Sequence, residues 1–496
     1  MTLGTIVAMV AIAAVVFTVL TWLVLKQQKS LIMSYAQNFC GGFFIFSGMV
    51  KAVDPLGLAY KMEQYFEQFE FVFDGTWFSF MSSLFPILTD YASGLSVFII
   101  VFEIVLGIML IMGHRPKFTS WSFLGLVVFF TVLTGFTFLT GYVPSDGAFF
   151  NFSSWGAYDS SNMKVTDCGC FGDFLKLEPK VSFQKDLFLL IPALFFIFRS
   201  KTMHHIGSSL LRNLVTVIAT LGLLYFCLSN FVWDIPDNDF RPFKKGADIA
   251  SQKKAEEDAA ANVQVLGVNL TNKSSNERVE IDYNTYLATF KDYPKEAWSV
   301  DYVQSEPTVE HTKISEFDVV DADGASLNDQ ILGSSGPLFL IVAYEIYGDA
   351  SPSTRIVRDT TYTLDTIYGS DQSVNIERSI LGVDERTEEY VDYLWKDFYT
   401  KRYEEVVSPF IREARADGIP GYIAVGADAT QIADFIDDMD LDIIGGESDD
   451  ILLKTIVRSN PGVVLFDKGL LVDKWHYKQL PDYGVVKSQH LSLIHI

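Results

Sequence analysis

Cysteine is scarce in this chain and its placement is uneven. The 496 residues include four cysteines, Cys40, Cys168, Cys170 and Cys227, and none follows residue 227. Four are too few for a disulfide scaffold. Positive charge is also lacking, with 38 Lys and Arg against 61 Asp and Glu and a formal net charge of −23. This balance excludes nucleic acid as a partner, because binding a phosphate backbone requires a basic surface.

Acidic residues are sparse before residue 235 and concentrated after it, whereas the first 234 residues are rich in Phe, Leu, Val and Ile. A helix that spans a membrane needs about 20 apolar residues. The first run lacks the basic start and small-residue cleavage site of a signal peptide, so we expect it to be retained. The sequence therefore predicts an α-helical transmembrane bundle of about six spans, at residues 3–26, 31–52, 92–113, 119–143, 184–200 and 208–231.

Basic residues lie in three short loops between these runs, which contain Lys26 and Lys29, then His114, Arg115 and Lys117, then Arg199 and Lys201. The three loops alternate along the chain so that they share one side, and basic loops are cytoplasmic. This predicts a protein in the lipid bilayer, with both termini, residues 53–91, the loop around Cys170 and the acidic C-terminal half on the extracytoplasmic side.

Residues 53–91 combine apolar and polar residues at helical spacing from Leu58 to Phe69, which predicts an amphipathic helix on the outer membrane interface. We expect a second short helix from Phe78 to Leu88, broken at Pro86.

Three charged residues fall in or beside the apolar runs. Glu103 lies near the middle of the third run, where a carboxylate is costly and therefore a functional candidate. The alternatives are that it is protonated or bonded to a nearby Ser or Thr. Lys51 and Asp54 lie at the outer end of the second run and are expected to pair with each other.

The tripeptide Cys168-Gly169-Cys170 lies in a polar loop between two apolar runs. Two thiols at this spacing can form a small, strained and therefore oxidising disulfide, remain a structural disulfide, or bind a soft metal. Two sulfurs alone make a poor zinc site, and no cofactor-binding motif for quinone or haem stands out, so the electron acceptor is not identified. Cys227 and Cys40 are candidate resolving thiols, although a buried cysteine is usually only a small apolar residue.

The C-terminal half is expected to hold a linker with a small β-rich segment at 235–311 and an extracytoplasmic α/β domain at 312–490. Buried strands are predicted at Pro337–Tyr344 and Tyr422–Val425, with a polar stretch and then helices around 387–416 between them. Short helices and a hairpin turning at Lys468-Gly469 complete the pattern. The order of elements resembles the thioredoxin fold, with Asn460-Pro461 at the usual position of a cis-proline. The Cys-x-x-Cys of such enzymes is missing, so this domain cannot perform dithiol chemistry alone.

The run Phe44–Gly57, together with Cys168-Gly169-Cys170-Phe171-Gly172, resembles the DoxX-like group and specifically its methylamine-utilisation MauE branch. The resemblance covers residues 31 to about 231. That family is usually a four-span bundle, so this chain carries at least one extra span. With its thioredoxin-like tail, the layout resembles DoxX-like proteins of the bacterial envelope. The resemblance implies a role in disulfide formation in an exported partner.

Three functions remain open from the sequence. The first is an accessory thiol–disulfide oxidoreductase in which Cys168 and Cys170 react. The second is a non-enzymatic envelope scaffold that docks an exported protein through the cysteine-free domain, and the third, supported only by Glu103, is a transporter. Residues 491–496 match what one reading frame of a common sequencing adaptor encodes, so we expect them not to belong to the protein.

Overall fold

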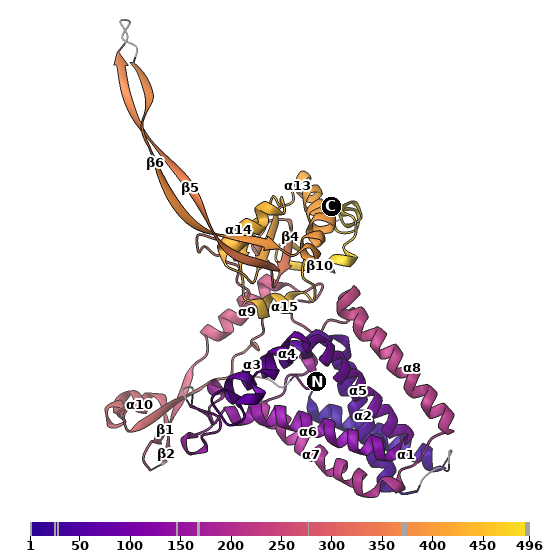
Figure 1. Cartoon of the computed structure of the whole chain (residues 1–496). Helices are drawn as coiled ribbons and strands as arrows, with labels where there is room; N and C mark the ends of the chain where they lie inside the picture. Colours follow the sequence, from indigo (N-terminus) through magenta and orange to yellow (C-terminus); the bar gives the residue numbers. More distant parts are fainter. Residues whose placement is uncertain are drawn as a thin grey trace. The chain divides into compact units, whose positions relative to one another are not determined.

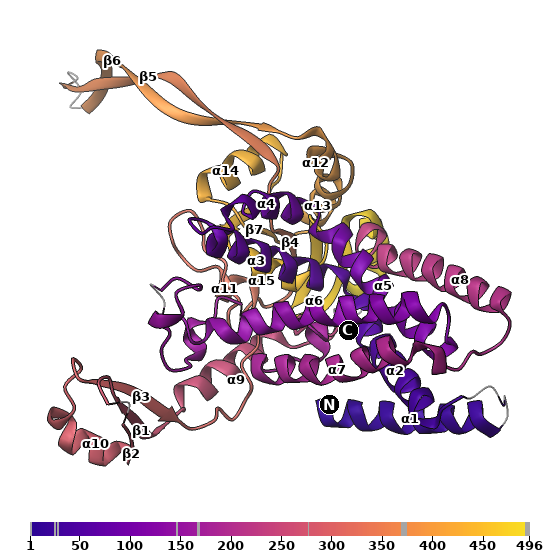
Figure 2. The same cartoon turned by 60° about the horizontal axis from the view of Figure 1, so that its bottom comes forward.

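The computed structural model describes residues 2–23, 26, 29–144, 147–165, 169–275, 277–368 and 374–491. The chain divides into two compact units, residues 1–244 and 245–496. Figures 1 and 2 show the course of the chain from two directions. The predicted boundary between residues 311 and 312 lies inside the second unit and stays a prediction.

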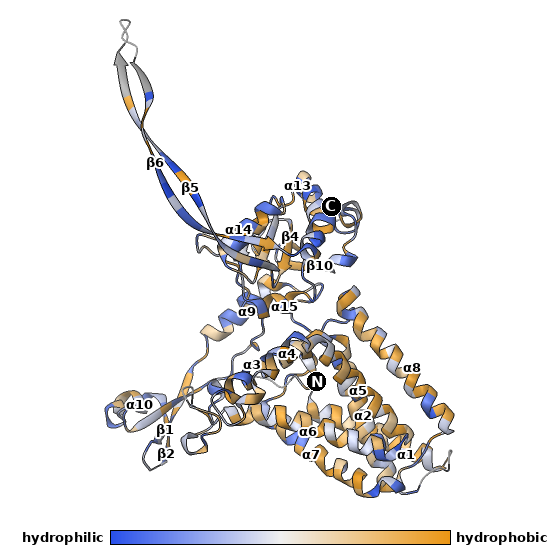
Figure 3. Ribbon diagram, viewed as in Figure 1, coloured by the Kyte–Doolittle hydropathy of each residue, from blue (hydrophilic) through white to orange (hydrophobic). Residues whose placement is uncertain are grey.

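The first unit is a bundle of helices covered by apolar residues (Figure 3). Within the described residues, five helices are long and apolar enough to cross a membrane, and α2 and α3 together form a sixth candidate that is bent by 93°. This agrees with the predicted number of about six spans. The long helices are α1 (Leu3–Leu23), α2 (Leu31–Val53), α3 (Pro55–Phe73), α5 (Ala92–Met112), α6 (Pro116–Thr140), α7 (Pro179–Arg199) and α8 (Ser209–Leu228).

Glycines bring α2 and α5 into close contact at the centre of the bundle. A Cβ atom on Gly41 would lie 2.7 Å from the carbonyl oxygen of Gly107, and one on Gly48 would lie 2.4 Å from the side chain of Ile104. Small residues allow helices in membranes to approach in this way. This line of contacts at Gly41, Gly48 and Gly107, called the glycine seam below, fixes the register of α2 against α5. The register in turn determines which charged residues of the two helices meet.

The segment after α2 is helical, as predicted. Helix α3 buries Leu58, Met62 and Phe66 in the apolar core. A short 3₁₀ turn at Ser79–Met81 and helix α4 (Leu84–Asp90) follow. The expected break at Pro86 is wrong, because this proline lies in the first turn of α4, where no intrahelical hydrogen bond needs its missing N–H.

The loop after α7 packs against the N-terminal part of α2 and the C-terminal end of α5. The amide of His204 donates to the side-chain oxygen of Gln37 at 3.0 Å. Its ring nitrogens contact the hydroxyl of Ser34 at 2.9 Å and the carbonyl oxygen of Ile111 at 2.7 Å. His204 is thus a buried structural residue with both nitrogens satisfied.

The second unit contains a five-stranded mixed sheet in the order β10-β9-β4-β7-β8. Strands β4, β7 and β8 are parallel, whereas β9 is antiparallel to β4 and β10 to β9. The apolar runs predicted as buried strands form its centre. The strands are β4 (Pro337–Ala343), β7 (Gly421–Val425), β8 (Ile444–Glu447), β9 (Gly462–Asp467) and β10 (Leu470–His476).

Helices α9 (Ile249–Ala261), α11 (Asn328–Ile331), α12 (Asp397–Arg402), α13 (Ser408–Ala416), α14 (Ala429–Asp438), α15 (Asp450–Ile456) and α16 (Tyr483–Val486) accompany this sheet. Phe435 of α14 and Ile411 of α13 share one apolar core with the strands. The predicted hairpin turn is confirmed, with positive φ at Lys468 (51°) and Gly469 (78°), and the Asn460–Pro461 peptide bond is cis.

A long two-stranded ribbon, β5 (Gly348–Tyr368) and β6 (Val374–Trp395), separates β4 from α12 and extends away from the sheet (Figure 1). The prediction of helix from about residue 387 is therefore wrong up to residue 395, and the polar stretch before it belongs to the same ribbon. Cross-strand ion pairs stabilise the ribbon, including Arg358–Glu385 and Arg355–Glu388. These pairs link residues about 30 positions apart, so local periodicity does not reveal them.

The expected small antiparallel piece is also present. Strands β1 (Val265–Asn272), β2 (Arg278–Asp282) and β3 (Trp298–Gln304) form a sheet in the order β2-β1-β3, with α10 (Tyr283–Thr289) between β2 and β3.

Candidate functional site

Lys51 of α2 and Glu103 of α5 form an ion pair in the bundle interior. Their side chains are only 2% and 3% exposed, so both charges are withdrawn from solvent. The ammonium of Lys51 also lies 4.7 Å from the centre of the Phe130 ring, a distance at which a cation is attracted to an aromatic face. Glu103 thus contacts the ammonium of Lys51, and not only a Ser or Thr hydroxyl.

The expected pairing of Lys51 with Asp54 is wrong. Helix α2 ends at Val53, and Asp54 instead caps α3 by accepting from the amide of Gly57 at 3.3 Å. Lys51 lies on the face of α2 that packs against α5, where its ammonium contacts the carboxylate of Glu103.

A second pair lies in α7, where Lys185 contacts Asp186, and the exposed fractions of their side chains are 13% and 3%. The hydroxyl of Thr134 in α6 donates to the other oxygen of Asp186 at 2.9 Å. The sequence did not single out Lys185 and Asp186, because they lie near the start of the fifth run, whose boundary is uncertain. Charged side chains at the end of a span commonly extend into solvent. The length of the fifth run could have pointed to them. The apolar residues alone are too few to span a membrane, so a spanning helix has to include Lys185 and Asp186.

A small cavity joins the two ion pairs to the cysteine loop. Its walls include Ser47, Lys51, Glu103, Cys170, Lys185 and Asp186, together with apolar side chains of α2, α6 and α7. Its free volume is about 10 Å³, enough for about one water molecule. The two ammonium groups and two carboxylates balance in charge, which lowers the cost of burying them.

Two glycines and a phenylalanine hold the Cys170 loop against the bundle. Gly169 and Gly172 have φ of 60° and 51°, the left-handed region that favours glycine. The hydroxyl of Ser47 donates to the carbonyl oxygen of Cys170 at 3.2 Å. The Phe171 ring packs edge-on against Phe43 at 5.8 Å. The loop therefore closes one end of the charged interior, and Cys170 is 7% exposed.

The other candidate cysteines are separate from this cavity or undescribed. Cys168 lies outside the described residues. Cys40 in α2 and Cys227 in α8 are buried free thiols, and neither lines the cavity. Their role as resolving thiols stays a prediction. In the part of the chain that the structure describes, no three His, Cys, Asp or Glu side chains are placed to hold a metal ion.

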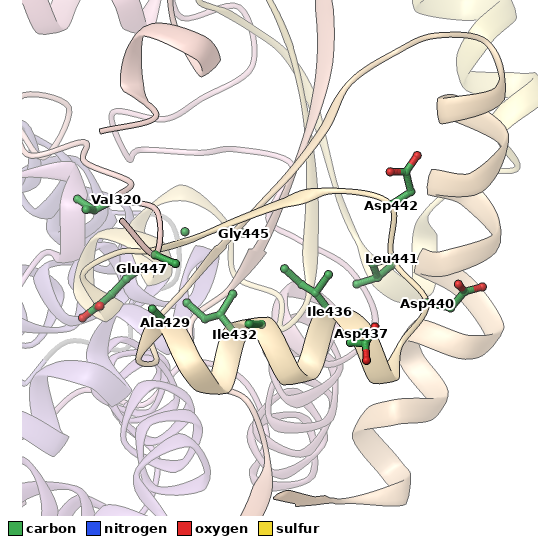
Figure 4. Close-up of a pocket in the computed structure, with 13 residues that line it drawn as sticks. Val320, Ala429, Ile432, Ile436, Asp437, Asp440, Leu441, Asp442, Gly445 and Glu447 are labelled. Atoms are coloured by element: carbon green, nitrogen blue, oxygen red, sulfur yellow. The ribbon is translucent and has the colours of Figure 1, made fainter. Parts of the chain in front are cut away.

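The second unit carries a larger cavity of about 470 Å³ between α14 and β8. Figure 4 shows Ile432 and Ile436 pointing from α14 toward the strand that carries Gly445. The remaining wall includes the acidic residues Asp437, Asp440, Asp442 and Glu447, and none of the described residues that line the cavity is basic.

Ion pairs neutralise part of this wall, because Arg412 contacts Asp440 and Arg415 contacts Asp442, each at 3.0 Å. The surface around the cavity is nevertheless strongly acidic. On α14, partial burial and the neighbouring carboxylates of Asp438 and Asp437 raise the pKa of Asp434. The cavity therefore suits an apolar group that carries positive charge.

Comparison with known protein families gives one match. Residues 29–146 match the family described as methylamine utilisation protein MauE. The matched range contains Lys51 and Glu103 but ends before Cys170. No curated protein and no solved structure matches the chain. These findings, together with the apolar helices, define a multi-pass membrane protein with a MauE-like segment.

Proposed function

We propose that the protein exchanges disulfides with an exported partner through Cys168 and Cys170. The observation that carries the proposal is the cavity that Cys170 shares with Lys51 and Lys185. Reactive cysteines characteristically have cationic neighbours, because the thiolate is the species that attacks. The MauE match supports a membrane accessory role, and kinship with the wider DoxX-like group would fit the same role.

The site would face the periplasm of a bacterial inner membrane. The three loops with excess Lys and Arg support this orientation, because such loops stay in the cytoplasm. An oxidising compartment is also where a Cys-x-Cys disulfide persists.

The exchange itself is balanced without a further reactant. A partner thiolate attacks one sulfur of the Cys168–Cys170 disulfide, and the other sulfur leaves as a thiolate. The second partner thiol then displaces the mixed disulfide, so the partner gains a disulfide while the loop gains two thiols. Two electrons and two protons pass from the partner to the loop. Ser47 would hold the Cys170 backbone in place during both steps.

Trapping tests this proposal directly. In a Cys170→Ser variant the loop disulfide cannot form, and the exchange can start only in reverse, when the Cys168 thiolate attacks a disulfide of the partner. Cys170 is then missing as the thiol that would release the partner, so we expect covalent complexes with exported proteins that reducing agent releases. The matched controls are Cys40→Ser and Cys227→Ser, which remove buried thiols outside the cavity. Normal oxidation of every exported protein in a Cys168→Ser, Cys170→Ser double variant that accumulates at the normal level would contradict the proposal.

A second candidate function is a scaffold that docks an exported partner through the second unit. The 470 Å³ cavity favours it, because its wall combines apolar side chains with more carboxylates than basic groups. Such a wall complements a basic, partly apolar peptide. We propose that this unit is a thioredoxin-like domain without the redox cysteines, and the parallel and antiparallel arrangement of β4, β7, β9 and β10 supports that fold.

Charge reversal separates the two functions. Asp437→Lys with Glu447→Lys should abolish recovery of a basic partner peptide, while the exposed Glu405→Lys should not. Unchanged recovery with the double variant would exclude this docking surface. A normal disulfide pattern in exported proteins, combined with lost recovery, would favour the scaffold over the exchange function.

A further inference from the structure

The first unit has another cavity, of about 480 Å³, formed by the C-terminal ends of α3 and α6 and the loop after α6. This volume lies in the range of small-molecule sites. Four phenylalanine rings contribute to its wall: Phe71, Phe136, Phe149 and Phe150. The Phe149 ring centre lies 5.1 Å from that of Phe136 and 5.4 Å from that of Phe150, so these three rings form one continuous aromatic surface.

The cavity lies at the level where a span meets the membrane boundary. Helix α6 ends at Thr140, and Trp77 and Phe152 nearby are 79% and 67% exposed. Exposed aromatic residues at a helix end are typical of the membrane–water interface. A molecule bound here would therefore have access to the lipid phase and to water.

Among the described residues, the polar part of the wall carries one charge of each sign. Asp74 and Lys164 both line the cavity, and both are exposed at its rim. No ion pair joins either of them to another described residue. Asp74 accepts only a local bond from the amide of Gly75, at 3.0 Å. The remaining polar groups include the side-chain amides of Gln68 and Asn162, and such amides are able to donate hydrogen bonds to phosphate or ester oxygens.

These features together indicate which chemical groups a ligand of this cavity carries. Aromatic rings next to a carboxylate recognise alkylammonium groups by cation–π attraction and charge. A lysine ammonium recognises a phosphate oxygen. Because both sets occur in one cavity at the membrane boundary, we propose that it binds the headgroup of a zwitterionic phospholipid. The ethanolamine or choline ammonium contacts the phenylalanine rings and Asp74, and the phosphodiester contacts Lys164.

Native mass spectrometry of the full chain, purified with an equimolar mixture of phosphatidylethanolamine and phosphatidylglycerol, tests the proposal. We expect the protein to retain phosphatidylethanolamine preferentially. Asp74→Asn should reduce that preference about fivefold, because only phosphatidylethanolamine carries the ammonium. Lys164→Gln should reduce the retention of both lipids, because both contain the phosphodiester. The matched controls Asp90→Asn and Lys176→Gln, exposed residues that do not line the cavity, should leave the preference and the retention unchanged.

A third variant, Ala148→Trp, fills the cavity from its wall and should remove the retained lipid while the melting temperature stays near that of the wild type. Soluble phosphoethanolamine, added as a competitor, distinguishes a free headgroup from a whole lipid: we expect no displacement at millimolar concentration. Equal retention of both lipids, full retention by the folded Ala148→Trp variant, or displacement by the free headgroup would overturn the proposal.

Discussion

The backbones at Gly41 and Gly107 approach so closely that a Cβ atom on Gly107 would lie 2.6 Å from the carbonyl oxygen of Gly41. This contact joins α2 to α5 between residues 66 positions apart. Glu103 lies about one helical turn from Gly107 on α5, and Lys51 lies about three turns from Gly41 on α2. The two side chains meet where these helices pack together. The glycine seam thus positions the buried ion pair.

Adding a single methyl group should open this seam. Gly107→Ala places a Cβ against backbone atoms that cannot move aside, and overpacking of this kind costs about 1–3 kcal/mol. We expect a lower melting temperature in detergent by scanning fluorimetry. Gly125→Ala in α6 is the control, because nothing lies within 4 Å of its added Cβ. Equal melting temperatures for the two variants would show that the helices are not in contact there.

Removing one charge of the central pair should destabilise the bundle more than removing both. Lys51→Met leaves Glu103 buried without its partner, which costs about 3–5 kcal/mol. Lys51→Met combined with Glu103→Leu replaces the pair by apolar groups and should recover most of that loss. The measurement is chemical or thermal unfolding in detergent, with the exposed Lys176→Met as a control. A double variant less stable than the single one would contradict the pairing.

Stability should fall in mild acid through His204. Burial lowers the pKa of this histidine from its ordinary value of 6.5, so the unfolded chain binds a proton more readily than the folded one. Stability is therefore complete above about pH 6.5 and decreases as the pH falls below it, by at most about 1.4 kcal/mol per pH unit. Unfolding measured between pH 7.5 and 5.5 checks the slope.

His204→Asn should flatten this dependence, whereas the exposed His311→Asn should leave it as in the wild type. If stability depends on pH equally in His204→Asn and in the wild type, another group causes the effect. His114 is then the next candidate, because burial and then Arg115 lower its pKa as well.

The ribbon should be dispensable for folding of the second unit. Its partners Pro352 and Val391 face each other, so Asn-Gly can replace residues 353–390 as a two-residue turn. No side chain described in that range is buried, and its ion pairs are exposed, each worth about 0.2–1 kcal/mol. We expect a melting temperature within a few degrees of the wild type by circular dichroism. Unfolding of the whole unit would show that the ribbon packs on the sheet.

Apolar length made the membrane half predictable. All six helices appear within a few residues of the predicted runs, since hydropathy over about 20 residues is a local property. The central strands β4 and β7 were predictable for the same reason, as short uninterrupted apolar runs. The Lys468-Gly469 turn followed from its residue types.

The ribbon and the buried pairs were not predictable in this way. Strands β5 and β6 pair across many intervening residues, and their exposed residues carry no alternating apolar pattern. Lys185 and Asp186 looked like the frayed end of a span, and Lys51 was assigned to the carboxylate closest in sequence. The strand pairs of the ribbon, the contact of Lys51 with Glu103 and the bond from Thr134 to Asp186 all join distant segments, which no window along the chain contains.

The sequence by itself determined that one half of this protein is apolar enough for a membrane, that the other half is an acidic α/β structure, and that two cysteines lie in a polar loop between spans. Only the tertiary structure decided that Cys170 shares a cavity with two buried ion pairs. The physical reason is that hydropathy is summed over neighbours in the chain, whereas a charge finds its partner according to which helix faces meet.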